Sequence, residues 1–351
     1  VSPYSATRLE RFAACAFAHF LQYGMKLTER VEYEFKPMDM GNVMHGALES
    51  FAEEVRKRGM KWTELTEQER NEIADRCLDN IVVDYGNTVL KSSARNEYMI
   101  ERTRRILRRT VWALQKQLEQ GEFQPEGFEV TFGGGRIDRV DIMEDQNKVY
   151  VKVIDYKTGN TSFDLVYLYH GLQLQLMIYL DGALRVEQKK YPDKEIIPAG
   201  VFYYNIKDPM IQEKIDADVE AVSAGLMKEL KMNGLVQADP ELVYRMDSSL
   251  GSIPVAFNKD GSFRKNSSVA DRTQFAVLGR YVRTKIEKIR SSILEGDAEV
   301  SPYELGKKNA CTYCPYMTVC GFDRRLSGYE FRRLKNFSDE ELWKAFDREA
   351  E

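Results

Sequence analysis

Three polar residues, Asp138, Asp155 and Lys157, have the types and spacing that a metal-dependent hydrolytic site needs. Asp155 and Lys157 form a D-x-K pattern within the segment VYVKVIDYKTG, and Asp138 lies in the preceding segment GRIDRVD. Two carboxylates can hold a divalent cation, and a lysine beside them can steady a water molecule or offset a developing negative charge. This combination suits the hydrolysis of a phosphodiester bond.

A β-hairpin would bring the two carboxylates together. Residues 149–156 are nearly all β-branched, aromatic or aliphatic, which predicts a strand, and residues 136–143 predict a second strand. The polar residues between these segments are typical of a turn. If residues 146–147 form a two-residue hairpin loop, Asp138 lies opposite Asp155.

The same register pairs further charges. Asp141 then faces Lys152 on the other side of the sheet in a cross-strand ion pair, and Lys157 shares a face with Asp155. Polar groups that cluster at the end of an apolar face are costly unless a cation or hydrogen bonds compensate them. The alternative is a hairpin whose mouth simply carries solvated charges.

Three of the five cysteines lie close together near the end of the chain. Cys311, Cys314 and Cys320 have the spacing C-x2-C-x5-C, which indicates thiolate ligation of a metal rather than disulfides. Four ligands are normally needed, so a fourth must come from elsewhere. Cys77 shares the apolar stripe of a predicted helix and is interpreted as a core thiol. We therefore expect Cys15 to be the fourth ligand. Zinc and a four-iron cluster both fit these ligands.

The remaining sequence predicts a small mixed sheet wrapped by helices. In the predicted helix over 38–59, His45 lies four residues before Glu49, so His45 is either a site residue or a surface histidine paired with Glu49. Residues 208–270 are mixed, and the polar stretch 258–274 is expected to be a flexible loop. The other predicted elements are helices over 4–25, 66–85, 95–120, 164–185, 212–233 and 271–295, and strands over 128–132 and 200–206.

Composition limits the class of protein. The chain has 351 residues, 43% of them hydrophobic, which is enough for a large core. No apolar run approaches the roughly 20 residues that span a bilayer, and no signal peptide is visible. The chain does not start with Met, from which we expect a fragment of a longer protein.

Charge gives a weaker indication of the partner. The net charge of −4 does not by itself indicate nucleic-acid binding. Basic residues nevertheless cluster over 102–109 and 324–335. Such clusters are either solvated faces or surfaces that follow a phosphate backbone. From the first cluster we take as candidate DNA contacts Arg102, Arg105 and Arg109.

Four motifs follow one another along the chain: GNVMHGALESF, GRIDRVD, VIDYKTG and QLQLMIY. In this order they resemble the RecB-type nuclease group of the PD-(D/E)xK superfamily, over roughly residues 1–325. With the cysteine set added, the chain looks most like the C-terminal nuclease domains of AddB-type helicase–nuclease subunits. The resemblance implies an α/β, restriction-endonuclease-like fold: a mixed central sheet wrapped by helices, with the chain ends joined by an iron–sulfur staple.

The resemblance implies a set of metal ligands. His45 matches the family's helix histidine and would be a ligand. Asp138 would be the bridging carboxylate ligand, and Asp155 the second carboxylate ligand, assisted by the backbone carbonyl of Tyr156. Mg²⁺ would be the physiological ion, because its ligands are oxygens together with substrate phosphate, and Mn²⁺ would substitute.

The other matching residues complete the implied machinery. Lys157 would orient or activate the attacking water, and Gln175 and Tyr179 would contact DNA or Lys157. The catalytic set would thus be Asp138, Asp155, Lys157, Gln175 and Tyr179. The resemblance favours a 4Fe-4S cluster over zinc, and its ligands would be Cys15, Cys311, Cys314 and Cys320.

The implied function is that of a metal-dependent exonuclease acting on single-stranded DNA ends. It would belong to a bacterial, cytoplasmic helicase–nuclease with an AddA-like partner subunit and no membrane contact, and would serve double-strand-break resection and recombinational repair. A free-standing RecB-like or Cas4-like exonuclease and a non-catalytic DNA-binding module are the alternatives. We expect a nuclease domain over 1–325, with 208–270 as an insertion or elaboration, and a basic, aromatic tail over 326–351.

Overall fold

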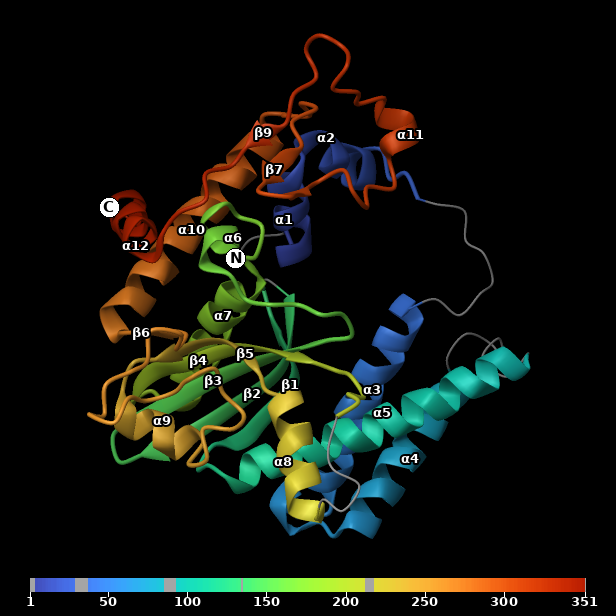
Figure 1. The fold of residues 1–351 in the computed structure, drawn as a ribbon, viewed down its shortest axis with the longest axis vertical. Coiled ribbons are helices and arrows are strands. Elements are labelled where there is room, and N and C mark those ends of the chain that lie inside the picture. The colour runs from blue at the N-terminus through green and yellow to red at the C-terminus, as the bar shows by residue number, and fades with distance from the viewer. Residues whose placement is uncertain (1–3, 29–36, 85–92, 134, 212–217, 351) are drawn as a thin grey trace.

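A mixed β-sheet lies at the centre of the molecule (Figure 1). The computed structural model describes residues 4–28, 37–84, 93–133, 135–211 and 218–350. Within these residues the sheet has six strands in chain order, antiparallel except for the parallel pairs β3–β4 and β5–β6. The strands are β1 (Gln124–Phe132), β2 (Gly135–Asp145), β3 (Lys148–Lys157), β4 (Glu195–Asn205), β5 (Asn233–Gln237) and β6 (Val269–Ala270). The mixed α/β architecture expected from the sequence is therefore confirmed.

Helices cover both faces of the sheet, because neighbouring strand residues point to opposite sides. Ile154 and Tyr156 pack on one face with α3 (Pro37–Lys57), α4 (Glu67–Asp84) and α5 (Ala94–Glu119). Val151 and Val153 pack on the other face with α1 (Ala6–Ala14), α7 (Gln175–Lys190), α10 (Arg272–Leu294) and α12 (Asp339–Ala350). The strand that carries the D-x-K residues is thus clamped between two apolar cores.

The single helix expected over 4–25 is wrong, because the chain leaves the helix at Cys15. Helix α1 begins after Ser5, which caps it by accepting the N–H of Arg8 at 3.3 Å. Cys15 is extended, with φ −166° and ψ 118°, and is followed by α2 (Ala16–His19) and a π-helix, η1 (Phe20–Gly24). Beyond this bend, Phe17 donates its N–H to the carbonyl of Glu299 at 3.0 Å. The bend therefore redirects the chain toward the C-terminal region.

The helix expected over 164–185 is also divided into two. Helix α6 (Leu165–Tyr169) ends near Gly171, whose φ of 77° lies in the left-handed region that glycine adopts without strain. Helix α7 then begins anew at Gln175. The break matters for the site, because it places Gln175 in the first turn of a helix.

The region over 208–270 extends the sheet at its edge. Helix α8 (Val219–Glu229) ends four residues before the expected end at residue 233. Residues 85 and 212–217 of the expected helices lie outside the described residues. Helix α9 (Pro240–Met246) follows β5. The stretch 258–274, expected as a flexible loop, contains Phe263, which forms an isolated bridge with Phe257 just before it, as well as strand β6 and the start of α10.

The C-terminal residues return to the start of the chain. Strands β7 (Tyr303–Leu305), β8 (Lys308–Asn309) and β9 (Arg332–Arg333) form a small second sheet, and α11 (Met317–Cys320) lies beside α2 (Figure 1). The expected tail contains α12, which packs on α10 with Leu342 and Phe346 buried. The remaining element is a 3₁₀ turn, η2 (Trp62–Glu64). None of the helices in the described part of the chain is long and apolar enough to cross a membrane.

Candidate active site

The β2–β3 hairpin carries the predicted D-x-K residues in the predicted register. Backbone pairs run from the loop at 146–147 to Arg139 opposite Ile154. The backbone ladder ends there, and the side chain of Asp138 takes over. Its Oδ2 accepts the backbone N–H of Tyr156 at 2.7 Å. Asp138 therefore sits where the two strands part, beside the D-x-K segment.

An ion cluster buried on the opposite face of the hairpin holds this register. Asp141 lies 2.9 Å from Lys152 Nζ, so the expected cross-strand pair is confirmed, and it accepts hydrogen bonds from Arg139 at 2.5 and 2.9 Å. Burial acts to raise the pKa of Asp141, but the two cations outweigh it and hold the pKa below its ordinary value. A one-residue slip of β3 against β2 would turn Lys152 to the other face, away from Asp141, so the cluster fixes the pairing on which the site depends.

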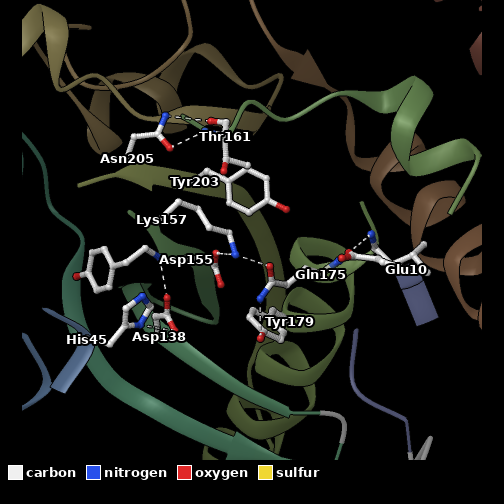
Figure 2. Close-up of polar contacts among 12 residues, drawn as sticks. Glu10, His45, Asp138, Asp155, Lys157, Thr161, Gln175, Tyr179, Tyr203 and Asn205 are labelled. Carbon is white, nitrogen blue, oxygen red and sulfur yellow. Dashed lines mark hydrogen bonds and ion pairs between the residues drawn. The ribbon is translucent and has the colours of Figure 1, made fainter. Parts of the chain in front are cut away.

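His45 approaches Asp138 from α3 (Figure 2). Its Nδ1 lies 3.4 Å from Asp138 Oδ1 and 3.8 Å from Glu129 Oε1. Burial opposes protonation of the ring, but hydrogen bonding and attraction to the two carboxylates raise the pKa of His45 to about 10. His45 thus faces an acidic pair in the sheet, which is not the surface pairing with Glu49 that the sequence left open.

Glu129 is a member of this group that the sequence reasoning missed. It lies in β1, between two residues that pair with the neighbours of Asp138 on β2, and its φ of 49° is rare for a non-glycine residue in a strand. Its buried carboxylate also contacts Arg136. Ligand atoms of His45, Glu129 and Asp138 all lie within 4.8 Å of one another. Pairing the predicted strand over 128–132 with the D-x-K hairpin would have found it.

Asp155 and Lys157 turn toward α7 (Figure 2). Lys157 Nζ lies 2.7 Å from Asp155 Oδ2 and donates to Gln175 Oε1 at 2.6 Å. Gln175 Nε2 in turn donates to the hydroxyl of Tyr179 at 2.9 Å. Burial, with repulsion from Asp138, raises the pKa of Asp155 to about 7, although Lys157 opposes the shift. A nearby cation stabilises the charged form of a carboxylate that is buried and repelled by another carboxylate.

The loop after Lys157 is fixed by two asparagines from neighbouring strands. Asn205 at the end of β4 forms hydrogen bonds with both the N–H and the carbonyl of Thr161, at 3.1 and 3.0 Å (Figure 2). Asn233 on β5 donates to the same carbonyl at 2.9 Å. The ring centroid of Tyr203 lies 5.3 Å from Lys157 Nζ. Two strands therefore hold the segment that follows the lysine.

Two of the three candidate DNA contacts on α5 lie beside an acidic residue. Arg105 Nε and Arg109 Nε lie 2.6 and 3.9 Å from carboxylate oxygens of Asp208. Arg109 also lies over the ring of Trp112, 5.2 Å from its centroid. Arg102 is exposed. A DNA-binding role for these arginines stays a prediction.

Cysteines from the two ends of the chain line one cavity. They are Cys15 after α1, and Cys311, Cys314 and Cys320 in and around α11. Cys77 instead lies in the core among α3, α4 and α5, where burial raises the pKa of its thiol to about 11. The structure thus gathers the four thiols that the sequence singled out and separates the fifth from them.

The spacing of these thiols bears on the metal they would hold. A single zinc ion binds thiolates at about 2.3 Å, which places tetrahedral sulfur ligands roughly 4 Å apart. Among the described residues, only His45, Glu129 and Asp138 form a group of three or more histidine, cysteine or acidic ligands within 4.8 Å of one another. The four thiols do not form such a group: in any set of three of them, at least one pair of sulfur atoms is more than 4.8 Å apart.

Comparison with known proteins gives one family match and several relatives. Residues 3–321 match the PD-(D/E)XK nuclease superfamily. A Lachnoclostridium phytofermentans protein described as a subunit of an ATP-dependent helicase/deoxyribonuclease is 43% identical over 370 residues. Proteins of the same description from Thermoanaerobacter sp. (strain X514) and Alkaliphilus metalliredigens are each 35% identical, over 371 and 374 residues. Each alignment covers 99% of this chain and 32% of the relative, so the chain spans about a third of the relatives' length.

Proposed function

Because the chain belongs to the PD-(D/E)XK nuclease superfamily, we propose that it is a divalent-metal-dependent deoxyribonuclease. One observation carries the proposal. The end of the β2–β3 hairpin brings Asp138, Asp155 and Lys157 together, with His45 3.4 Å from the first of them. These groups supply a metal site and a cation beside it, which is the equipment for hydrolysis of a phosphodiester bond.

The donor set fits a hard divalent cation. The carboxylates of Asp138, Asp155 and Glu129 offer oxygens, as Mg²⁺ prefers, and the imidazole of His45 offers a nitrogen that Mn²⁺ tolerates better. The backbone carbonyl of Tyr156 is a further candidate ligand. When bound, the cation would act as a Lewis acid on the phosphate and lower the pKa of a water molecule.

Lys157 would supply a fixed positive charge beside the cation site. Its ammonium group is held by Asp155 on one side and by Gln175 on the other, at 2.7 and 2.6 Å. A positioned ammonium group can orient the attacking water and offset the charge that develops on the phosphate oxygens. Tyr179 supports the amide of Gln175, so we assign both residues to holding the lysine in place.

The descriptions of the relatives suggest the wider setting. Their name combines a helicase with a deoxyribonuclease. We propose that this chain likewise acts within a helicase–nuclease with an AddA-like partner subunit, as an exonuclease on single-stranded DNA ends produced during double-strand-break repair. A free-standing exonuclease would need no such partner. The complete acid and lysine set argues against a non-catalytic DNA-binding module.

We also propose that the four thiols hold a 4Fe-4S cluster. Three of them come from the cysteine motif near the end of the chain and one from Cys15, so the cluster would join the two chain ends. Four cysteine thiolates are the ligand set of such a cluster. Thiolate ligands stabilise such a cluster, and cluster binding would stabilise the fold of the surrounding segments.

The experiment is a cleavage assay on end-labelled single-stranded DNA with the purified chain. We expect nucleotides or short fragments to be released with Mg²⁺ or Mn²⁺ and no release with EDTA. Progressive shortening from a free end, with a closed circle of the same sequence left intact, would support the exonuclease mode. An absence of cleavage with either cation, in protein that carries its full metal content and binds DNA, would contradict the nuclease proposal.

A further inference from the structure

A carboxylate outside the group of candidate metal ligands reaches the nuclease site through the start of α7. Glu10 lies on α1, and its Oε1 accepts the backbone N–H groups of Leu174 and Gln175 at 2.7 and 3.0 Å (Figure 2). These N–H groups belong to the N-cap residue and the first residue of α7. N–H groups at the start of a helix have no hydrogen-bond partner within that helix. Leu174 has no side chain that could cap the helix itself.

Some groups around the Glu10 carboxylate favour its charged form, while its burial opposes that form. The N-terminus of a helix carries partial positive charge, which stabilises an anion within the first turn. Among the groups that face Glu10, Lys157 on β3 attracts the carboxylate and Asp155 repels it. Burial raises the pKa of Glu10 to about 7. The cost of removing this carboxylate from water must be compensated by the hydrogen bonds and charge contacts that it makes.

Gln175 connects this contact with the lysine. Its backbone N–H is held by Glu10, while its side-chain oxygen accepts from Lys157 Nζ at 2.6 Å. Lys157 Nζ in turn lies 2.7 Å from Asp155. The four residues therefore form one continuous series of polar contacts from α1 to the D-x-K segment.

The C-terminal end of helix α1 is held in place by the segment that contains the thiols. It ends at Ala14, and the next residue, Cys15, lines the cavity of thiols. Arg11, which follows Glu10, donates to the sulfur of Cys314 at 3.8 Å. The position of Glu10 is thus set by the packing of the chain ends, five residues away from one of the thiols.

We propose that Glu10 is a positioning residue of the nuclease: it fixes the first turn of α7, so that Gln175 holds Lys157 next to Asp155. This inference rests on the proposed function. It assigns a role to a residue that touches neither the candidate metal ligands nor, in the proposed arrangement, the substrate. A displacement of the lysine by about 1 Å can lower a rate on the order of a hundredfold.

The test compares Glu10→Ala with Glu10→Gln. Glutamine keeps an oxygen that can accept both N–H groups, whereas alanine removes it. We expect kcat of the alanine variant to fall by about tenfold to a hundredfold, with KM for DNA and Mn²⁺ affinity unchanged. The glutamine variant should recover kcat to within about threefold of the parent. Asp239→Ala is the control, because Asp239 accepts two N–H groups at the start of α9 in the same way but forms no hydrogen bond with the site residues described above.

A double-mutant cycle shows whether Glu10 acts through Gln175. If it does, Glu10→Ala should have little further effect on kcat in a Gln175→Ala background. Additive losses, equal losses in the alanine and glutamine variants, or a loss confined to KM would overturn the proposal. If the alanine variant does not fold, Glu10→Asp, which withdraws the carboxylate by one methylene, takes its place in the cycle.

Failure of the nuclease proposal can be told apart from failure of this one. A parent chain that does not cleave DNA contradicts the proposed function alone. The positioning role is then measured by amide hydrogen exchange at Leu174 and Gln175. Exchange should be faster in the alanine variant and near the parent rate in the glutamine variant, and equal rates in all three proteins would overturn the role of Glu10.

Discussion

Asp138 accepts the backbone N–H of Tyr156 at 2.7 Å, so a side chain of β2 closes the hairpin where backbone pairing ends. The two oxygens of this carboxylate have separate environments. Oδ2 binds the neighbouring strand, and Oδ1 lies 3.4 Å from Nδ1 of His45. Asp138 therefore holds the neighbouring strand with one oxygen and faces another candidate metal ligand, His45, with the other. Replacing Asp138 would disturb both contacts. Substitutions of the surrounding residues separate the two effects more cleanly.

Glu129→Gln tests whether the missed carboxylate contributes to the cation site. Its oxygen lies within 4.8 Å of the ligand atoms of His45 and Asp138, so removing its charge should weaken Mn²⁺ binding by about tenfold or more. Calorimetric titration of the chain with Mn²⁺ measures the change. Glu126→Gln on the same strand is the control, because Glu126 pairs with Lys190 at 2.8 Å instead. Equal Mn²⁺ affinities in the parent and the Glu129 variant would exclude the contribution.

Asp141→Ala tests the ion cluster that holds the hairpin register. The substitution leaves Arg139 and Lys152 buried without their shared counter-ion, and the free energy of unfolding should fall by about 3–5 kcal/mol. Urea denaturation measures the change. Asp181→Ala, which removes a more exposed partner of Arg185 and Arg283, should cost about 1 kcal/mol or less. Similar losses in both variants would argue against a special role for the buried cluster.

The pH dependence of stability should contain a contribution from His19. Burial, together with the charge of Arg8, lowers the pKa of His19 to about 4, and its Nε2 accepts a hydrogen bond from Arg8 at 3.1 Å. Between the ordinary pKa of about 6.5 and this value, the unfolded state binds more protons than the folded state. The contribution is therefore fully present above pH 6.5 and is lost as the pH falls toward 4.

Comparison of the parent with His19→Gln isolates this effect. The difference in free energy of unfolding between the parent and the variant should be about 1–2 kcal/mol smaller at pH 5 than at pH 7. Chemical denaturation at both pH values gives the two differences. A stability difference that does not change between pH 7 and pH 5 would show that His19 titrates normally.

Cys15→Ser and Cys77→Ser test the assignment of the thiols. Cys15 lines the cavity with the three C-terminal cysteines, whereas Cys77 is a core thiol. We expect Cys15→Ser, purified without oxygen, to lose most of the iron and the absorbance near 400 nm, and Cys77→Ser to keep both. Iron analysis measures the iron content, and the visible absorption spectrum measures the absorbance. A parent protein that contains stoichiometric zinc and no iron would contradict the cluster.

The hairpin could be predicted in detail because its signals are local. A turn of two polar residues between two apolar runs fixes the register, and the charges of Asp141 and Lys152 agree with it. The motifs around His45 and Gln175 could be placed on helices for the same reason. Their distances from Asp138 and Lys157 could not be obtained, because these depend on how helices pack on the sheet.

Three features could not be predicted, because their causes lie far away in the sequence. Cys15 interrupts the first helix in favour of contacts with the C-terminal region, which no nearby residue signals. Glu129 joins the site through pairing of β1 with β2 and through a φ of 49° that strand periodicity does not reveal. Glu10 was missed likewise, because its partners lie on α7.

Asp155 and Lys157 are the two residues that we propose to carry out the chemistry on DNA. The most direct measurement compares Mn²⁺-dependent cleavage of single-stranded DNA by the parent, Asp155→Ala and Lys157→Ala, with DNA affinity measured on the same preparations. We expect a loss of kcat of at least about a hundredfold in each variant, with DNA affinity within about threefold of the parent. Cleavage by either variant at the parent rate would exclude these catalytic roles.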